Sequence, residues 1–416
     1  MPDVQAIAES VFRQESGKII AGLIRLSGSF DLAEEAMQEA FASAIVSWAQ
    51  KGVPDNPAAW ITSVAQRKIV DQIRREQTRR GNEDALIYET EHLKTHHDPE
   101  IEDEAMHLPD DRLRLIFTCC HPAINQEAQV ALTLRTLGGL TTPEIAHAFL
   151  VPEATLAQRL VRAKRKIQDA RIPYQVPPAE VLPERLASVQ AVLYLIFNEG
   201  YTAASGEQLI RRDLCAEAVR LTRVLCELMP NEPENVGLLA LMLVQDSRRN
   251  ARISSKGELI TLEEQDRSLW DQSEIQEGVR LVEQALRRRQ SGPYQLQAAI
   301  AAIHAQAKTP AETDWQEIAA LYQELYRLSP TAIVALNHAV AVAMNQGFEP
   351  GLRLLDELGA SGRLDDYYLF HAARADLLRR LRRAGEARSA YERALKLATN
   401  QVEQQYLRRR LSELSV

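Results

Sequence analysis

The chain has 416 residues, of which 45% are hydrophobic and 25% charged, a composition typical of a soluble globular protein with two or three domains. No run approaches the roughly 18 apolar residues of a membrane span, and the N-terminus lacks the basic start and apolar stretch of a signal peptide. The four cysteines show no disulfide spacing, so we expect a cytoplasmic protein without a membrane partner.

The net charge of −8 is unevenly distributed along the chain. Residues 81–111 hold one basic and eleven acidic side chains, whereas residues 112–175 hold nine basic and four acidic ones. Charge segregated in this way indicates modules with different partners. Apolar residues recur at spacings of three and four in nearly every window, which predicts an all-α fold.

The first clear element is an amphipathic helix over residues 30–48, "FDLAEEAMQEAFASAIVSW". Its spacing directs Leu32, Ala36, Phe41 and Ile45 inward. The opposite side is an acidic strip of Asp31, Glu34, Glu35, Gln38 and Glu39. Carboxylates repel phosphate, so the strip predicts a protein contact; a solvated face is the alternative.

A second helix is predicted from Asn56, as its cap, and Pro57 in its first turn, to Arg80. Trp60, Val64, Ile69 and Ile73 form an apolar stripe, and the far end is basic. A basic helix with an aromatic residue suits melted DNA, because cations meet phosphates and bases stack. An ordinary core position is the alternative for Trp60. The candidate DNA-facing residues are Trp60, Arg67, Lys68, Asp71, Arg74 and Arg75.

Two breaks divide the chain. Residues 81–111 are polar, acidic and interrupted by prolines, so we expect a linker there. Four prolines lie within residues 172–183, which ends the basic region. The predicted organisation is a helical domain at 1–80, the acidic linker at 81–111, a second helical domain at 112–175 and a C-terminal domain at 176–416.

Residues 140–167, "LTTPEIAHAFLVPEATLAQRLVRAKRKI", predict a helix-turn-helix. Thr142 can cap the first helix, which buries Ile145, Ala148 and Phe149. After a turn through Leu150 and Val151, Pro152 opens the second helix, with an inner face of Leu156, Leu160, Ala163 and Ile167. In such a unit the second helix enters the major groove, and a helical hairpin with a solvated basic face is the alternative. The candidate DNA contacts are Thr155, Gln158, Arg159, Arg162, Lys164 and Lys166.

The C-terminal 241 residues contain spaced repeats of small and apolar residues. Spacings of four, three and five residues separate Ala218, Thr222, Leu225 and Pro230, and the same spacings recur at Ile318, Tyr322, Leu325 and Pro330. The spacings of four and three alone recur at Gly278, Val282 and Ala285, at Gly351, Leu355 and Leu358, and at Ala387, Tyr391 and Ala394. The distances between later copies bracket the 34 residues of a tetratricopeptide repeat. We therefore expect an α-solenoid of tetratricopeptide-like repeats that contacts a regulatory protein or peptide; plain helix packing is the alternative.

Catalytic and metal-binding motifs are weak in this sequence. Cys119 and Cys120 are adjacent and lie in an apolar run, which predicts buried thiols and not a zinc site. His96 and His97 supply imidazoles, but no second ligand pair stands nearby. There is no phosphate-binding loop and no nucleophile or zinc-protease motif, so we expect no enzyme, no metal and no cofactor.

Residues 10–170 resemble an extracytoplasmic-function sigma factor, a specificity subunit of bacterial RNA polymerase. "DLAEEAMQEAFASA" resembles the segment that docks on the clamp helices of the polymerase largest subunit, which implies a core-binding role for Asp31, Glu34, Glu35 and Gln38. "AAWITSVAQRKIVDQIRRE" resembles the segment that engages the −10 promoter element, with Gln66 and Arg67 replacing the usual Arg-Asn pair. Residues 140–167 resemble the −35-reading domain, and the whole chain resembles the subgroup with a C-terminal repeat extension.

Two other functions are open at this stage. A conventional helix-turn-helix regulator with a repeat sensor domain would bind duplex DNA without joining the polymerase. A metal-dependent enzyme would use the Cys, His and Asp residues. The segments at 31–48 and 56–80 favour the sigma factor, because an ordinary regulator needs neither a clamp-binding strip nor a melting helix.

Overall fold

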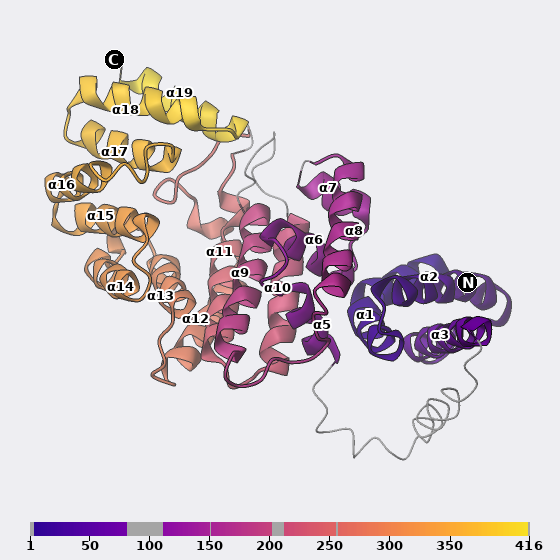
Figure 1. The fold of residues 1–416 in the computed structure, drawn as a ribbon. Helices are drawn as coiled ribbons and strands as arrows, with labels where there is room; N and C mark the ends of the chain where they lie inside the picture. The colour runs from indigo at the N-terminus through magenta and orange to yellow at the C-terminus, as the bar shows by residue number, and fades with distance from the viewer. Residues whose placement is uncertain (1–3, 81–110, 150, 202–211, 255–256, 415–416) are drawn as a thin grey trace. The chain divides into compact units, whose positions relative to one another are not determined.

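The structure is a computed structural model that describes residues 4–80, 111–149, 151–201, 212–254 and 257–414. The described residues form an all-α protein, as predicted, with one isolated bridge between Ile253 and Leu259 and no strand (Figure 1). The chain divides into two compact units, Met1–Val192 and Leu193–Val416. Most of the acidic linker, residues 81–110, lies outside the described residues.

The first unit contains two groups of helices. The helices before the linker are α1 (Val4–Ser27), α2 (Phe30–Lys51) and α3 (Pro57–Arg80). Those after it are α5 (Asp111–Cys119), α6 (Gln126–Thr136), α7 (Thr142–Ala148), α8 (Glu153–Asp169) and the first part of α9 (Leu182–Tyr201). Residues 170–181 contain no helix, so α8 ends just before the proline-rich stretch.

Helices α2 and α3 begin at side-chain caps. The Ser29 hydroxyl accepts a hydrogen bond from the Leu32 amide, and the Asn56 side chain accepts one from the Ala59 amide, which confirms the predicted cap of α3. In α2 the buried positions are Phe30, Ala33, Ala36, Met37, Ala40, Ala44 and Trp48. The prediction that Ile45 points inward was wrong: its side chain is 45% exposed, because the buried stripe runs through Ala44 and Trp48 instead.

The helix-turn-helix forms at the predicted place. All four predicted inner residues of α8, namely Leu156, Leu160, Ala163 and Ile167, are buried. The predicted cap of α7 was one residue off, because Thr141 and Glu144 form a capping box in which each side chain binds the other residue's backbone amide. Ile145 is buried as expected, whereas Leu150 and the side chain of Ala148 lie outside the described part.

The two adjacent thiols are buried, as the sequence predicted. The Cys119 sulfur lies 3.3 Å from the Thr136 hydroxyl, and the Cys120 sulfur lies 3.6 Å from that of Thr133. Burial raises the pKa of Cys120 to about 12, against a smaller lowering by Thr133, so the thiol stays protonated at neutral pH. These residues are part of the core between α5 and α6.

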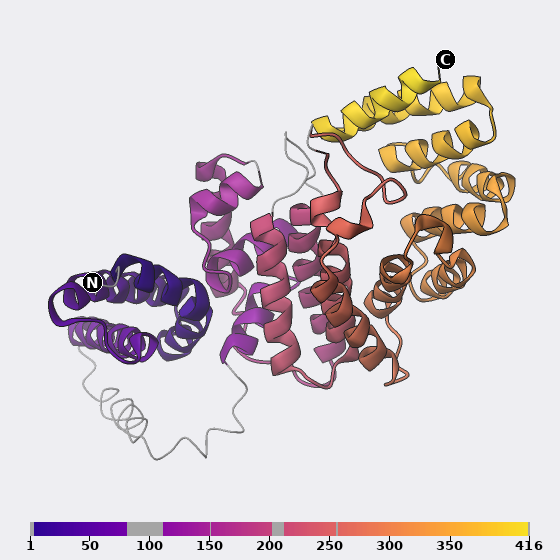
Figure 2. The same cartoon turned by 180° about the vertical axis from the view of Figure 1, so that it is seen from behind.

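The second unit is a series of helical hairpins in which each hairpin packs on the next (Figure 2). After α9, its helices are α10 (Arg212–Leu228), α11 (Pro233–Asp246), α12 (Gln272–Leu286), α13 (Pro293–Gln306), α14 (Trp315–Leu328), α15 (Ala332–Gln346), α16 (Phe348–Gly359), α17 (Tyr368–Arg380), α18 (Ala384–Leu397) and α19 (Gln401–Glu413). Short 3₁₀ turns lie at Arg249–Ala251, Arg267–Leu269 and Pro310–Glu312.

The repeated residues of the sequence lie on α10, α12, α14, α16 and α18, except for Pro230 and Pro330, which follow the ends of α10 and α14. Most of them are buried, including Ala218, Val282, Leu355 and Tyr391. In the copy on α16 the first residue, Gly351, has to be small, because an added Cβ would lie 2.3 Å from the Ala343 Cβ of α15. At Gly351 the repeat spacing therefore marks the line along which α15 and α16 touch.

No helix among the described residues is both long and apolar enough to cross a bilayer.

Candidate nucleic-acid interface

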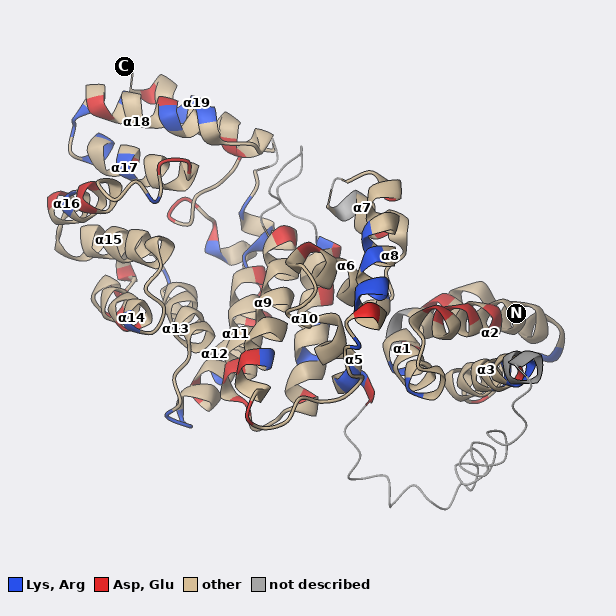
Figure 3. Cartoon of the chain, viewed as in Figure 1, with Lys and Arg blue, Asp and Glu red and all other residues tan. Residues whose placement is uncertain are grey.

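The outer face of α2 combines acidic and apolar side chains. Asp31, Glu35 and Gln38 are exposed, and Glu34 is half-buried beside them. Residues three, four and seven apart lie on one side of a helix, so the same exposed line continues through Ala42, Ile45 and Val46. Val46 is 61% exposed. We call these residues the α2 face; Figure 3 shows the acidic residues of α2 in red.

The apolar end of the α2 face was missed from the sequence. Ile45 was expected to complete the core because its spacing matches that of the other apolar residues, and Val46 was not singled out. The signal that could have found them is their neighbour Ala44, which together with Trp48 already fills the inward positions of that turn. Two large aliphatic residues on the opposite side of the helix are left without a place in the core.

The outer face of α3 carries an aromatic residue and cations. Arg67, Asp71, Arg74 and Arg75 are exposed on the same side of the helix as Trp60, and we call these five residues the α3 face. The Trp60 ring is half-buried and meets the buried Trp48 edge-on, with centroids 5.6 Å apart. Trp60 therefore belongs partly to the core and partly to the surface.

The sixth candidate of this helix lies to one side. The ammonium of Lys68 pairs with the Glu39 carboxylate of α2 at 2.6 Å. Lys68 thus links α2 to α3 and is less exposed than Arg67 and Arg75.

Helix α8 presents five of its six candidates on one side, the α8 face: Thr155, Gln158, Arg159, Arg162 and Lys166. All are exposed except Arg159, which is half-buried and pairs with Glu127 of α6 at 2.6 Å. The Arg162 guanidinium donates to the Gln158 side chain at 3.3 Å. Figure 3 shows the basic residues of α8 in blue.

Lys164 lies on the opposite side of α8. Its ammonium is 2.8 Å from a Glu34 carboxylate oxygen and 3.0 Å from one of Asp31, and its side chain is only 14% exposed. The structure therefore brings together one predicted DNA contact and two predicted polymerase contacts. Nearby, the Tyr174 hydroxyl donates to the Ala21 carbonyl oxygen of α1 at 2.8 Å, which also joins the two groups of helices.

The described residues contain no cluster of three or more His, Cys, Asp or Glu side chains arranged to hold a metal ion. The histidines at 96 and 97 fall outside those residues.

Family models match most of the chain outside the linker. Residues 11–79 match the model described as sigma-70 region 2, and residues 114–167 match sigma-70 region 4. Residues 185–286 match a family of unknown function, DUF6596.

Two relatives extend these matches. A protein from Rhizobium meliloti (strain 1021) named "Uncharacterized protein R00370" is 45% identical over 400 residues, which cover 95% of this chain and 93% of the relative. The probable ECF RNA polymerase sigma factor SigI from Mycobacterium tuberculosis is 26% identical over 176 residues, covering 41% of this chain and 58% of SigI. The chain belongs to the extracytoplasmic-function sigma factors. It carries a C-terminal helical extension beyond regions 2 and 4. No solved structure matches this sigma factor.

All three faces lie within the residues that match sigma-factor regions. The α2 and α3 faces both lie in region 2, and the α8 face lies in region 4. Sigma factors are transcription initiation factors and not enzymes, which agrees with the lack of catalytic motifs in the sequence.

Proposed function

We propose that this sigma factor binds RNA polymerase core through the α2 face, melted −10 DNA through the α3 face and −35 duplex DNA through the α8 face. The observation that carries the proposal is that these faces are exposed within the matched regions and differ in chemistry. The α2 face is acidic and apolar, whereas the α3 and α8 faces are mainly cationic.

The α2 face suits a protein partner. Its carboxylates would repel a phosphate backbone, and its exposed Ile45 and Val46 give an apolar centre beside a polar edge, as protein interfaces have. The clamp helices of the polymerase largest subunit are the expected partner in this family.

The α3 and α8 faces suit two forms of DNA. On α3, Arg67 and Arg75 can meet phosphates while the accessible side of Trp60 stacks on an unpaired base. On α8, the helix start with Thr155 and Gln158 enters the major groove, and Arg162 and Lys166 reach base edges or phosphates further along.

Core binding would then require a rearrangement near the start of α2. Lys164 of region 4 forms ion pairs with Glu34 and Asp31, so the clamp helices would compete with Lys164 for these carboxylates. The pair with Asp31 is largely exposed on the carboxylate side, and such pairs are weak enough to exchange with a partner.

The helical extension is proposed to control activity through protein contacts. Its hairpins resemble tetratricopeptide repeats in spacing, and such arrays commonly bind proteins or peptides. The half-buried Arg185 of α9 donates to the Phe117 carbonyl oxygen in the first unit, so a truncation that leaves this unit intact should end after α9, at residue 201. We expect transcription to change several-fold between the full chain and residues 1–201.

The test is binding of the full chain to purified core polymerase. Glu35→Arg combined with Val46→Asp should lower the affinity at least about tenfold, because it inverts one charge and places another in the apolar centre. Glu283→Arg, on an exposed surface of the second unit, is the matched control and should bind like the wild type. The proposal is wrong if the wild type does not bind core, or if the double variant binds equally well.

A further inference from the structure

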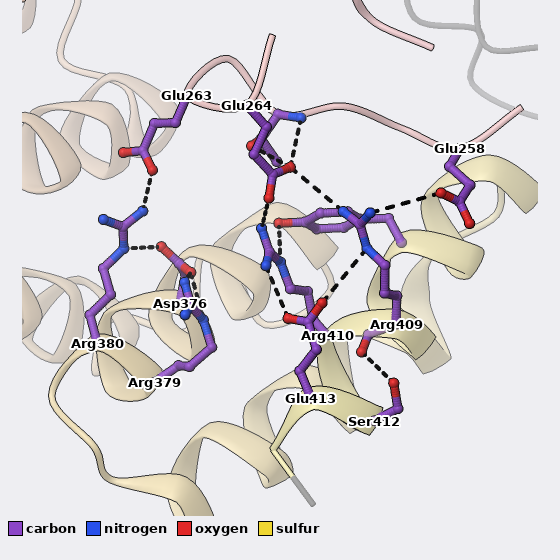
Figure 4. Close-up of polar contacts among 12 residues, drawn as sticks. Glu258, Glu263, Glu264, Asp376, Arg379, Arg380, Arg409, Arg410, Ser412 and Glu413 are labelled. Atoms are coloured by element: carbon purple, nitrogen blue, oxygen red, sulfur yellow. Dashed lines mark hydrogen bonds and ion pairs between the residues drawn. The ribbon is translucent and has the colours of Figure 1, made fainter. Parts of the chain in front are cut away.

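A segment of the second unit crosses from one part of the hairpin series to another without helical structure. We call residues 257–266, "GELITLEEQD", the strap. It begins at the bridge between Ile253 and Leu259 and ends where Asp266 caps the 3₁₀ turn at Arg267–Leu269. In sequence it lies between α11 and α12, yet its side chains reach α17 and α19 (Figure 4).

The strap holds its two central glutamates in a defined turn. The Glu264 amide donates to the Thr261 carbonyl oxygen at 2.8 Å, and the Glu264 carboxylate accepts from the Thr261 hydroxyl at 2.9 Å. Burial tends to raise the pKa of Glu264, but the Thr261 hydroxyl and the Arg410 charge outweigh this and lower it. Glu264 is therefore presented as a carboxylate.

Arginines of the C-terminal hairpins receive these carboxylates. Arg380 of α17 pairs with Glu263 at 2.6 Å, and Arg410 of α19 pairs with Glu264 at 2.7 Å. Arg409 adds longer contacts to Glu258 and Glu264, at 3.9 and 3.6 Å. Figure 4 shows Arg380, Arg409 and Arg410 directed toward the three strap glutamates.

The receiving arginines are held in place by their own surroundings. Asp376 binds the other side of the Arg380 guanidinium at 2.6 Å, and Glu413 binds Arg410 at 3.0 Å. The Tyr406 ring lies 5.2 Å from the centre of the Arg410 guanidinium. Cations fixed in this way form a prepared site for carboxylates, because little side-chain freedom is lost on binding.

The strap does not fill the surface that it crosses. A cavity of about 250 Å³ lies beneath it, lined on one side by Leu262 and Glu263 and on the other by α13, α15, α17 and α19. Of these, α13, α15 and α17 are the first helices of successive hairpins. Trp315 at the start of α14, with Val340 and Met344 of α15, gives the cavity an apolar part beside the arginines.

We propose that this surface is a docking groove for an extended acidic peptide of a partner protein, and that the strap occupies it as a built-in substitute. The inference rests on the proposed role of the extension in protein contacts, and it specifies the site and the partner's chemistry. The partner carries an apolar residue followed by two carboxylates, as Leu262, Glu263 and Glu264 do. Its apolar side chain enters the cavity.

The strap is suited to displacement. Glu263 and Glu264 are 41% and 40% exposed, and ion pairs at such sites contribute little stability. Being tethered, the strap nevertheless acts at a high effective concentration and excludes weak competitors. A partner peptide therefore competes only when it supplies more contacts or when the strap is weakened.

The experiment uses the full chain and a fluorescent peptide that copies residues 257–266. The wild type should bind this peptide weakly, because the strap in cis has the same contacts. The chain carrying Glu263→Gln and Glu264→Gln should bind it at least about tenfold more tightly, since only the peptide then offers carboxylates to Arg380 and Arg410. Adding Arg410→Gln to that chain should remove the gain. Glu283→Gln is the matched control for loss of an acidic side chain, and core binding should be unchanged in all four chains.

A second measurement avoids substitutions altogether. Excess peptide should speed hydrogen exchange of the strap amides in the wild-type chain and leave α11 unchanged. Equal peptide binding by the wild type and the double glutamine chain would overturn the proposal, as would equal binding of a peptide with both glutamates changed to glutamine. The strap would then be a fixed structural loop, whereas failure of core binding would instead contradict the proposed function.

Discussion

The two units of this sigma factor use their cations differently. In the first unit, Arg67, Arg75, Arg162 and Lys166 are exposed and form no ion pair with any described residue. In the second unit, Arg249 contacts three carboxylates, and so does Arg409. Cations that form no ion pair with the described residues are available to a polyanion, whereas paired cations hold the protein's own elements together.

The difference separates binding from stability. Removing an exposed cation of the α3 or α8 face should weaken DNA binding with little effect on folding. Removing a paired arginine of the second unit should do the reverse. Three substitutions or conditions test this contrast.

The largest effect is expected at Arg249. Its guanidinium lies 2.6 Å from Glu274 and 2.9 Å from Asp246, and Arg249→Ala leaves both carboxylates partly buried and unpaired. We expect a loss of about 3 kcal/mol in the free energy of unfolding, measured with urea, and no change in DNA affinity. Arg287→Ala is the control, because its pair at 3.8 Å is exposed. Equal stabilities of the two variants would contradict this assignment.

The second-largest effect is expected on DNA affinity, at Arg162. Arg162→Ala should weaken binding to a preferred −35 duplex by about 1–3 kcal/mol if the side chain reads a base, with the free energy of unfolding unchanged. Lys166→Ala should weaken all duplexes alike and reduce the salt slope by about 1. Fluorescence anisotropy over a salt series measures both. Identical, sequence-independent losses would show that the α8 face makes phosphate contacts only.

The smallest effect concerns His304, whose ring meets Trp315 edge-on at 5.0 Å. Burial, assisted by the charges of Arg248 and Arg267, lowers its pKa from 6.5 to about 4. Between these values the unfolded chain binds a proton that the folded chain does not, so stability falls as the pH falls. From pH 7 to 5.5 we expect a loss of about 1 kcal/mol that is absent in His304→Gln. The same pH dependence in both chains would contradict a neutral buried His304.

The sequence predicted best where one side of a helix had to serve the core. The four inner residues of α8 follow helical spacing and stand opposite charged residues, and all four are buried. Prediction was wrong at Ile45, because spacing alone does not distinguish an apolar residue of the core from one kept at the surface for a partner. The capping box of Thr141 and Glu144 was readable from the sequence but was placed one residue too late.

The contacts of the strap could not be predicted from any local sequence pattern. Its contact between Glu263 and Arg380 joins residues that are 117 positions apart. The pairing of Lys164 with Glu34 joins residues 130 positions apart. Helical periodicity describes which side of an element is apolar, but it does not say which distant element will supply the partner of a charge.

The most direct test of the account is transcription by core polymerase with the full-length chain on a library of randomised promoters. We predict initiation from a minority of sequences that share two elements spaced as −10 and −35, and loss of this activity with Glu35→Arg and Val46→Asp. If the chain selects duplex DNA from the library by itself but never starts transcription with core, it is a conventional regulator and the central claim is wrong.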